Sequence, residues 1–399
     1  MSEKTDILII GGGIVGLGIG IAVLNQKPDL KVKICDKETD LGQHASGRNS
    51  GVLHAGFYYS PDSLKARFCR DGNAELKQLC QRNKIPVQTV GKVVVASSEQ
   101  EDARLDELFN KGIANGVELE LLPHSQLPNY EPLAITFNRF LWSPNTAIAE
   151  SGLVLNAMKQ EFVSRGGQIA TASAVRLKNI NKEVVAEGFN AQIIVNAAGA
   201  QSDRIARSVG LANHYAMLPF MGIYRSVYAE KLPIKRLVYP VPHPINPFLG
   251  VHLTITANGK VKIGPTAIPI LGREQYSLFH GWSMSDIGQA LLAASSLIKG
   301  ESHRVGEILK SELPKVYQPA LVNAASKLVP SVKQVKNWKK NPPGIRAQLV
   351  DKRTGRLEQD FVVEQFANSI HILNAVSPGW TSALPFSRWI AETKVLPLL

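Results

Sequence analysis

Three glycines near the start of the chain have the spacing of a dinucleotide-binding turn. An apolar run at residues 6–10 leads into Gly11-x-Gly13-x-x-Gly16, and small and apolar residues follow up to residue 25. In this arrangement the first glycine permits a tight turn, the second lets the backbone approach a pyrophosphate, and the third lets a helix pack against the strand. The helix N-terminus then faces the phosphate charge. The pattern predicts that the chain binds a dinucleotide cofactor.

An acidic residue at the end of the next apolar run narrows this interpretation. Residues 32–36 read Val-Lys-Ile-Cys-Asp, so Asp36 lies 20 residues beyond Gly16, where a carboxylate can accept hydrogen bonds from a ribose. A carboxylate there favours a free 2′-hydroxyl and repels a 2′-phosphate, which argues against NADP and leaves FAD and NAD open. The alternative is a glycine-rich strand, turn and helix that binds nothing.

A long polar loop at residues 42–56 is the second feature that could hold a cofactor. It reads Gly-Gln-His-Ala-Ser-Gly-Arg-Asn-Ser-Gly-Val-Leu-His-Ala-Gly, which is too elaborate for a plain crossover connection. Its amides and hydroxyls offer many donors to a pyrophosphate or to the edge of a flavin. A second strand and glycine turn, at residues 192–203, returns the chain to the nucleotide-binding sheet.

The elements that must position these residues can be read from apolar spacing. It predicts helices over residues 62–84, 99–115, 152–165 and 283–325, a strand within 87–96, short strands over 168–194, and strand, glycine loop and final helix over 359–395. Residues 217–267 are rich in strand-forming residues and proline, which indicates a separate antiparallel sheet. The fold class that we predict is α/β, α+β overall, with a discontinuous Rossmann-like domain.

Composition excludes several classes of protein. The 399 residues are 44% hydrophobic and 20% charged, which argues against disorder, and they exceed one ordinary core, so two domains are expected. Three cysteines without CxxC spacing support neither a disulfide framework nor a zinc site, and no other metal site is predicted. The apolar stretch 7–24 contains six glycines, unlike a membrane span. We expect a soluble, cytoplasmic protein whose net charge of +12 attracts anions.

Seven segments, in order across essentially the whole chain, carry a family resemblance. They are His-Ala-Ser-Gly-Arg-Asn-Ser-Gly-Val-Leu-His-Ala-Gly-Phe-Tyr-Tyr (44–59), Ser-Leu-Lys-Ala-Arg (63–67), Val-Asn-Ala-Ala-Gly-Ala-Gln-Ser-Asp-Arg (195–204), Tyr-Pro-Val-Pro (239–242), Phe-Leu-Gly-Val-His-Leu-Thr (248–254), Gly-Ile-Arg-Ala-Gln (344–348) and Ser-Pro-Gly-Trp-Thr-Ser-Ala (377–383). The chain resembles the FAD-dependent L-2-hydroxyglutarate dehydrogenases, bacterial oxidase included, within the D-amino acid oxidase superfamily. The resemblance implies non-covalent FAD and oxidation of L-2-hydroxyglutarate, or a close L-2-hydroxy acid, to the 2-oxo acid by hydride transfer to flavin N5.

We therefore expect an FAD-binding domain formed by residues 1–85, 150–210 and 345–399, and an antiparallel-sheet substrate domain formed by 86–149 and 211–344. The residues expected to contact the cofactor are Gly11, Gly13, Gly16, Asp36, Lys37, Ser46, Asn49, Ser50, Gly51, Val175, Ala198, Gly199, Gly379, Trp380, Thr381 and Ser382. The amides at 379–382, at the start of the last predicted helix, could stabilise negative charge on the flavin.

Oxidation of a 2-hydroxy acid needs a cation for the carboxylate and a base for the hydroxyl proton. Arg346 occupies the place where superfamily members hold the substrate carboxylate, and a guanidinium can pair with it bidentately. His54 and His252 are the candidate bases, because histidine titrates near neutral pH. The alternatives are a surface arginine and two structural histidines. A covalent bond from His54 to the flavin, as some superfamily members have, is less favoured.

Other residues concern the second carboxylate of the substrate. Lys65 is similar to a family lysine and could meet this carboxylate, although a solvated position on a helix is as well supported. Tyr239 is a further expected substrate contact. Several positions in or near the substrate half depart from the family pattern and put the exact acid in doubt: Met221-Gly222 where relatives have Arg-Gly, Ala147 to Glu150, residues 243–247, Thr266 and the bulky Trp380.

The basic excess and the electron acceptor are open questions at this stage. Residues 327–340 carry five lysines beside Leu328, Val332, Val335 and Trp338. That stretch could touch anionic lipid at the cytoplasmic face of the inner membrane and help pass electrons to a quinone; the alternative is a solvated face. Another acceptor, or oxygen, would serve equally. No nucleic-acid motif is present. The rival functions are an amino acid or amine oxidase of the same superfamily and a flavin-containing nucleic-acid-binding protein.

Overall fold

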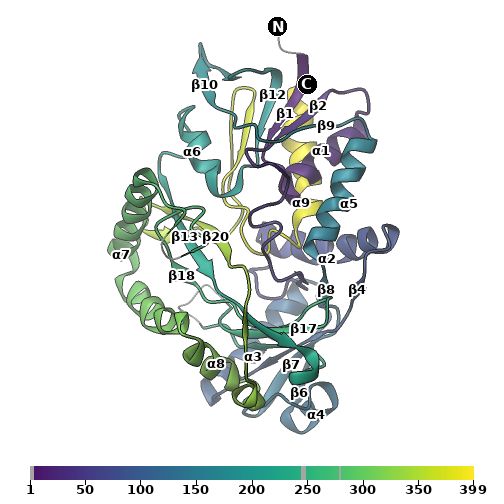
Figure 1. Cartoon of the computed structure of the whole chain (residues 1–399), viewed down its shortest axis with the longest axis vertical. Helices are drawn as coiled ribbons and strands as arrows, with labels where there is room; N and C mark the ends of the chain where they lie inside the picture. Colours follow the sequence, from purple (N-terminus) through teal and green to yellow (C-terminus); the bar gives the residue numbers. More distant parts are fainter. Residues whose placement is uncertain (1–3, 244–248, 278–279) are drawn as a thin grey trace.

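The computed structural model describes residues 4–243, 249–277 and 280–399. Residues 244–248, which include most of one expected departure and the start of one family-like segment, lie outside the described residues. Elsewhere the chain forms two halves, one above the other in Figure 1. We call them the nucleotide half, built on a six-stranded sheet, and the substrate half, built on an eight-stranded and a four-stranded sheet.

The sheet of the nucleotide half is mainly parallel. Its strands in spatial order are β22 (Val363–Phe366), β23 (Ser369–Ile372), β12 (Asn190–Asn196), β1 (Lys4–Ile10), β2 (Val32–Cys35) and β9 (Gln168–Ala170). β1 pairs in parallel with β12 and β2, and β22 runs antiparallel to β23. Residues 7–10 are apolar and buried on both faces, as a central parallel strand requires. The carboxyl ends of these strands meet at one edge, where ligands bind in such sheets.

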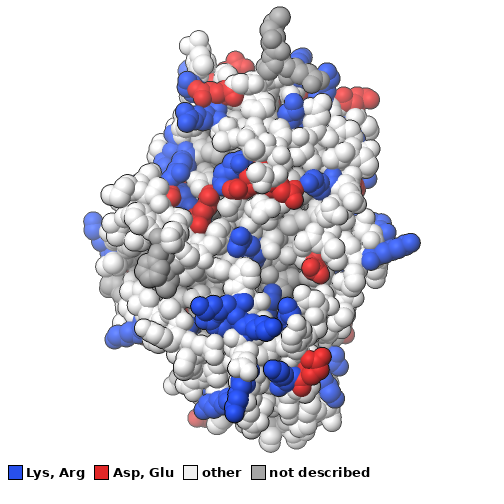
Figure 2. All heavy atoms as spheres, viewed as in Figure 1, with Lys and Arg blue, Asp and Glu red and all other residues white. Residues whose placement is uncertain are grey.

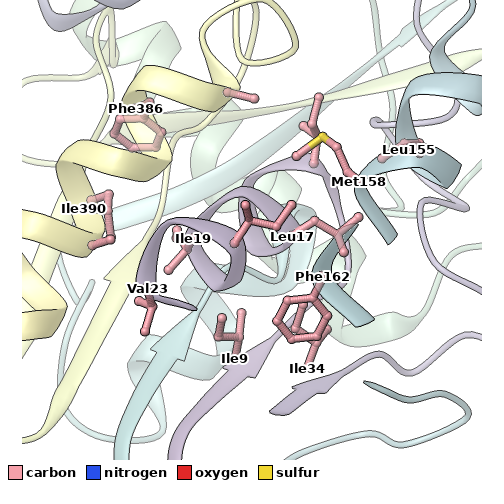
Figure 3. Packing of buried hydrophobic residues seen from close by; sticks show 14 of the residues in the cluster. Ile9, Leu17, Ile19, Val23, Ile34, Leu155, Met158, Phe162, Phe386 and Ile390 are labelled. Carbon is pink, nitrogen blue, oxygen red and sulfur yellow. The ribbon is translucent and has the colours of Figure 1, made fainter. Parts of the chain in front are cut away.

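Helices cover both faces of this sheet. Figure 3 shows α1 (Ile14–Gln26) between α9 (Ala383–Ile390) and α5 (Ser151–Ser164), with Phe162 and Phe386 buried against it. α2 (Leu64–Arg82) packs against α9. On the other face lie the hairpin β10 (Leu177–Ile180) and β11 (Glu183–Ala186) and the short helix α6 (Ser202–Arg207). Both termini of the described chain belong to this half (Figure 1).

The larger sheet of the substrate half is mainly antiparallel. Its strands in order are β19 (Lys339–Lys340), β14 (Arg225–Tyr228), β17 (Lys260–Gly264), β16 (His252–Ile255), β15 (Leu237–Pro240), β5 (Lys92–Val95), β7 (Arg139–Ser143) and β6 (Glu120–Pro123). Side chains alternate between two buried clusters, so that Val93 and Val95 contribute to one and Val94 to the other. α3 (Glu99–Ala114) packs on one face, and α4 (Leu127–Tyr130) and α8 (Gln318–Ser326) pack on the opposite face.

Two smaller sheets join the halves. β18 (Ile268–Pro269), β13 (Tyr215–Gly222), β20 (Gly344–Asp351) and β21 (Arg356–Leu357) form one, covered by α7 (Met284–Glu312); β3 (Val52–Leu53), β8 (Ala147–Ala149) and β4 (Val87–Gln88) form the other. β20 pairs with β13 along its whole length. The domain boundary expected at residue 345 falls inside β20 and would divide this sheet, so we assign β20 to the substrate half. The predicted α/β class is confirmed.

Two expectations differ from the structure. The helix predicted over 283–325 is divided into α7 and α8 by a 3-10 turn at Leu313–Val316, where Pro314 cannot donate a helical hydrogen bond. The lysine-rich stretch 327–340 is not an amphipathic surface: it forms a 3-10 turn and β19, and the side chains of Leu328, Val332 and Trp338 are buried in the core. Its five lysines are exposed, and Lys339 lies 5.6 Å from the exposed Tyr228 ring. Within the ranges described, no helix is long and apolar enough to span a membrane.

Candidate active site

A single cavity of about 810 Å³ lies between the two halves. Its wall includes the turns after β1, β2 and β12, the 42–54 loop and residues 375–381 from the nucleotide half, and parts of β13, β15, β16, β20 and the 265–276 segment from the substrate half. Figure 2 shows a hollow on this face, with acidic and basic side chains mixed above it and a band of Lys and Arg side chains below it. The cavity therefore joins the predicted nucleotide site to the predicted substrate site.

The glycine turn forms the innermost wall in the nucleotide half. Gly11 donates its amide to Cys35 O at 2.8 Å and has φ +104°, and a Cβ there would lie 2.6 Å from Ala197 O. Gly16 does not line the cavity; a Cβ on it would lie 2.0 Å from Gly11 O, so it permits α1 to pack against the turn. Gly13 lines the cavity at the N-terminus of α1. It is the N-cap residue of this helix and offers no side chain to cap it. The start of α1 is therefore suited to a phosphate.

Asp36 is held at the carboxyl end of β2 and lines the cavity. One carboxylate oxygen accepts the Gly12 amide at 2.8 Å and the other accepts the Glu38 amide at 2.9 Å. These bonds fix the carboxylate beside the glycine turn, as a ribose-binding acid requires. Lys37 also lines the cavity, and its Nζ contacts Glu38, His44 and Glu274. Those three residues are the described group closest to metal-ligand geometry, but the ammonium already occupies the space among them.

The polar loop is shaped by its own side chains. Asn49 donates to Ser46 O at 2.7 Å and accepts the Gly51 amide at 2.8 Å, and Ser46 Oγ accepts the Ile14 amide at 3.0 Å. Ser46, Asn49 and Ser50 line the cavity, whereas Gly51, with φ +75°, supports the loop from behind. The loop therefore meets α1 at the cavity edge, which the sequence alone did not reveal.

The C-terminal turn closes the same end of the cavity. Gly379, Trp380 and Thr381 line it, together with Val175, Ala198 and Gly199, whereas Ser382 lies behind them as the residue before α9. Thr381 Oγ1 accepts the His54 amide at 3.1 Å, which ties this turn to the polar loop. Trp380 Nε1, His54 Nδ1 and Tyr239 Oη are buried atoms without a hydrogen-bond partner among the described residues. Unpartnered polar atoms in a cavity wall, beside a glycine turn and a ribose-binding acid, fit a large polar cofactor such as FAD.

In the substrate half, His252 and Tyr239 form a stacked pair. Their ring centroids are 3.8 Å apart with the planes at 16°, and both rings are buried in the cavity wall. His252 Nδ1 lies 2.9 Å from Gly250 O. Because a carbonyl can only accept, Nδ1 carries the proton, and burial lowers the pKa of His252 to about 3. The neutral ring therefore has its lone pair on Nε2 and can accept a proton.

His54 lies at the other side of Tyr239, with the two rings edge to face at 6.4 Å. Burial lowers its pKa well below the usual value, and the positive charges of Lys92 and Arg346 act in the same direction, as would a proton on His252. Both predicted bases are thus neutral and lie in one wall. In the structure His54, His252 and Tyr239 lie together, although His54 is far from the other two in the sequence.

Arg346 lies on β20 opposite Phe220 of β13, half-buried in the cavity wall. Burial lowers its pKa, and Tyr224, Tyr59 and Glu312 act against that shift. An arginine remains charged under such shifts, so the substrate end of the cavity holds a fixed positive charge. Lys65 does not line the cavity: its Nζ lies 5.9 Å from the Phe361 ring, and burial lowers its pKa to about 8.

Several wall residues had no recognisable signal in the sequence. Tyr224, Arg273, Glu274, Tyr276 and Glu312 all line the cavity. Arg273 is buried and pairs with Asp203 at the start of α6, which clips the 265–276 segment to the nucleotide half. These residues lie in loops and at helix ends of the substrate half. Neither hydrophobic periodicity nor a sequence motif identifies them there. The sequence signal related to this ion pair was Asp203, which lies inside a family-like segment.

Comparison with known proteins identifies the family. Residues 6–393 match the model of the family described as FAD dependent oxidoreductase. A mitochondrial L-2-hydroxyglutarate dehydrogenase from Caenorhabditis elegans is 35% identical, with 98% of this chain and 93% of the relative covered. The L-2-hydroxyglutarate dehydrogenase of Escherichia coli K12 is also 35% identical, over 99% of this chain and 94% of the relative. The chain belongs to the L-2-hydroxyglutarate dehydrogenase family of FAD-dependent oxidoreductases.

The fold of this L-2-hydroxyglutarate dehydrogenase family member is shared with other flavoenzymes. An L-α-glycerophosphate oxidase from Mycoplasma pneumoniae, solved with FAD bound, matches with a TM-score of 0.76 and 22% identity, over 98% of this chain and 96% of that one. At this identity the match supports the fold alone. The predicted family, enzyme class and FAD cofactor are confirmed.

Proposed function

We propose that this family member oxidises L-2-hydroxyglutarate, or a close L-2-hydroxy acid, to the 2-oxo acid. The observation that carries the proposal is one cavity in which a cofactor cradle faces a fixed cation, Arg346, and two neutral histidines. Full-length relatives named for this reaction support the choice of acid. The departure at Met221 bears little on it, because that side chain is buried with Ile270 and Ile345 and does not line the cavity.

In the proposed reaction Arg346 binds the α-carboxylate, because a guanidinium matches the two oxygens of a carboxylate. His252 accepts the hydroxyl proton on Nε2, while the bond from Nδ1 to Gly250 O fixes its ring and tautomer. Bound FAD supplies the N5 atom that accepts the α-hydride. The buried Tyr239 ring holds His252 in place by stacking.

The remaining predicted residues take supporting roles in this proposal. His54, with its neutral ring and unpartnered Nδ1, is the alternative base. Lys65 and Tyr239 are the candidates for the second carboxylate; Lys65 does not line the cavity, but it is close enough to Arg346 for that charge to lower the pKa of Lys65. The cofactor contacts are those of the glycine turn, Asp36, the polar loop and the 379–382 turn. FAD is non-covalent, and electrons pass to a quinone, another acceptor or oxygen.

An anaerobic titration tests this function. Purified FAD-loaded protein is mixed with L-2-hydroxyglutarate, its D-isomer, L-lactate, L-malate and glycine, and the flavin absorbance near 450 nm is followed. We expect bleaching by L-2-hydroxyglutarate with release of the 2-oxo acid. Bleaching by glycine with release of ammonia would support the amine oxidase alternative instead. Bleaching by another hydroxy acid alone would move the assignment to that acid.

A further inference from the structure

Lys92 is a buried charge that the proposed reaction does not use. It is the first residue of β5, between β15 and β7, and its relative exposure is 0%. It pairs in register with Leu237, and two residues further Val94 pairs with Tyr239. Because alternate residues share a face, Lys92 lies on the face of the sheet that carries Tyr239. A lysine at this place sits in the core, next to the cavity wall.

Three aromatic rings surround the ammonium. Lys92 Nζ lies 4.4 Å from the ring centroid of Phe57, 4.5 Å from that of Tyr58 and 4.8 Å from that of Tyr239. We call these three rings the aromatic box. Among the described residues Nζ has neither a hydrogen-bond partner nor an ion pair with a carboxylate. The faces of the rings are therefore what attracts the cation.

Tyr239 is shared by the box and the cavity. The same ring that contacts Lys92 stacks on His252 and meets the edge of His54. The box therefore supports the histidine pair from behind. Lys92 itself does not line the cavity, and Tyr239 is the side chain that links it to the two histidines.

The charge of Lys92 acts on both histidines. It lowers the pKa of His54 and of His252, in addition to the larger effect of burial. The other ionisable groups that interact with this cluster include Tyr58 of the box, Tyr59, Tyr224, the buried thiol of Cys69 on α2, and Arg346 on β20. Burial lowers the pKa of Lys92 itself to about 7, and Cys69 acts weakly in the opposite direction. Among the described residues Lys92 has no carboxylate partner, whereas Glu312 acts to raise the pKa of Arg346.

We propose that Lys92 is a positioning residue for the oxidation, which holds Tyr239, and through it His252, from behind and places a positive charge behind the two cavity histidines. The inference rests on the proposed function for the reaction that the histidines serve. The charge also adds to the positive field that receives an anionic acid. Lys92 itself does not touch the substrate.

The pH profile of kcat/KM for L-2-hydroxyglutarate tests this role in two variants. Lys92→Met keeps the length and removes the charge, and Lys92→Arg keeps the charge. The acid limb of Lys92→Met should move up by about one pH unit, since a nearby cation no longer opposes protonation of the histidines. The limb of Lys92→Arg should stay at the wild-type pH even if the rate falls. An unmoved limb in Lys92→Met with full FAD content would overturn the proposal.

A second measurement needs neither substrate nor a stable Lys92→Met variant. FAD-loaded wild-type and Lys92→Arg proteins labelled with ¹³C at lysine Cε are titrated by NMR. One lysine signal should titrate near pH 7 in the wild type and be absent from Lys92→Arg. If the signal that is absent from Lys92→Arg titrates above pH 9, Lys92 is not the desolvated cation proposed here. The signal of Lys65, expected near pH 8, should remain in both proteins. If the wild type does not oxidise L-2-hydroxyglutarate, the proposed function fails, while this titration still decides whether the box holds such a charge.

Discussion

The cavity wall in the nucleotide half is built around three glycine-containing turns, whereas the ionisable side chains of the substrate half come from strands of two separate sheets. The Gly11 turn, the 197–200 turn and the 379–381 turn present amides at the carboxyl ends of parallel strands. Across the cavity, Arg346, His252 and Tyr239 project from strands of the two other sheets. Backbone amides can bind the shared parts of a cofactor, and side chains can distinguish one acid from another. The turns carry local sequence motifs, whereas Arg346 and His252 stand in segments that only the family resemblance marked.

Two buried histidines, one in each half, make the comparison sharper. His371 on β23 uses both ring nitrogens, with Asn196 at 3.0 Å from Nδ1 and Ser369 at 3.0 Å from Nε2. His252 has a partner on Nδ1 alone among the described residues, and it lines the cavity. Burial lowers the pKa of both, to about 4 and about 3. A low pKa therefore does not by itself mark a base; the remaining lone pair does.

The largest expected effect concerns the backbone wall. A Cβ at position 16 would lie 2.0 Å from Gly11 O, so the side chain of Gly16→Val would force α1 to move away from the turn. We expect the protein to lose FAD completely and to melt at lower temperature. Flavin absorbance per protein and thermal unfolding measure both. Gly152→Ala is the control, because nothing lies within 4 Å of its Cβ and it should keep full FAD. A Gly16→Val protein with full FAD would refute this account of the turn.

The next effect concerns the base. His252→Asn keeps a donor for Gly250 O but removes the lone pair of Nε2, and kcat should fall by roughly 10²- to 10⁴-fold. FAD content and binding of a non-oxidised dicarboxylate should remain, since neither uses Nε2. Rapid-mixing measurement of flavin reduction gives the rate, and His54→Asn is the matched variant. A greater loss in His54→Asn would transfer the role of base to His54.

Arg346→Met removes the fixed cation and should lower kcat/KM by roughly 10²- to 10³-fold, because the substrate carboxylate would enter a desolvated wall unpaired. Arg346→Lys should recover part of this loss, as an ammonium keeps the charge without the bidentate fork. Steady-state kinetics on FAD-loaded protein measure both variants. Equal kcat/KM in Arg346→Met and wild type would exclude Arg346 as the carboxylate site.

Acid stability tests the burial of the structural histidine, His371. The folded pKa of His371 is below its unfolded value, so the unfolded chain binds the proton first and stability falls as pH drops from about 6.5 to 4. His371 should account for about 2–3 kcal/mol of that loss. Urea unfolding of wild type and His371→Gln at pH 7 and pH 4.5 measures it. His371→Gln should lose less stability between these two values; an identical loss would contradict the assignment.

The residues that could be predicted from the sequence follow the same division between the nucleotide half and the substrate half. Gly11, Gly13, Asp36 and the 379–381 turn were predicted because backbone geometry restricts residue type at fixed spacing, and all line the cavity. His54, His252 and Arg346 could be placed only through the family resemblance, since nothing local marks a side chain that meets others across a fold. Lys92 was read as an ordinary strand residue. Its surroundings come from β15 and the loop after β3, and no pattern of neighbouring residues encodes such a contact.

Three lysines that lie beside the rings of Tyr228 and Tyr224 give the smallest expected effect. Lys260 and Lys339 each lie 5.6 Å from the exposed Tyr228 ring, and Lys262 lies 5.8 Å from the ring of Tyr224, which lines the cavity. Such a row should draw a dianionic acid toward the opening.

Lys260→Gln with Lys339→Gln should lower kcat/KM about two- to five-fold at 10 mM salt and leave it unchanged at 500 mM, where charges are screened within a few ångströms. The pair Lys4→Gln with Lys27→Gln removes the same charge from the amino-terminal edge of the β1 sheet, away from the cavity, and should have no effect at either salt concentration. An equal loss in both pairs would mean that net charge, rather than this row, attracts the substrate. Selectivity would then come from the cavity wall alone.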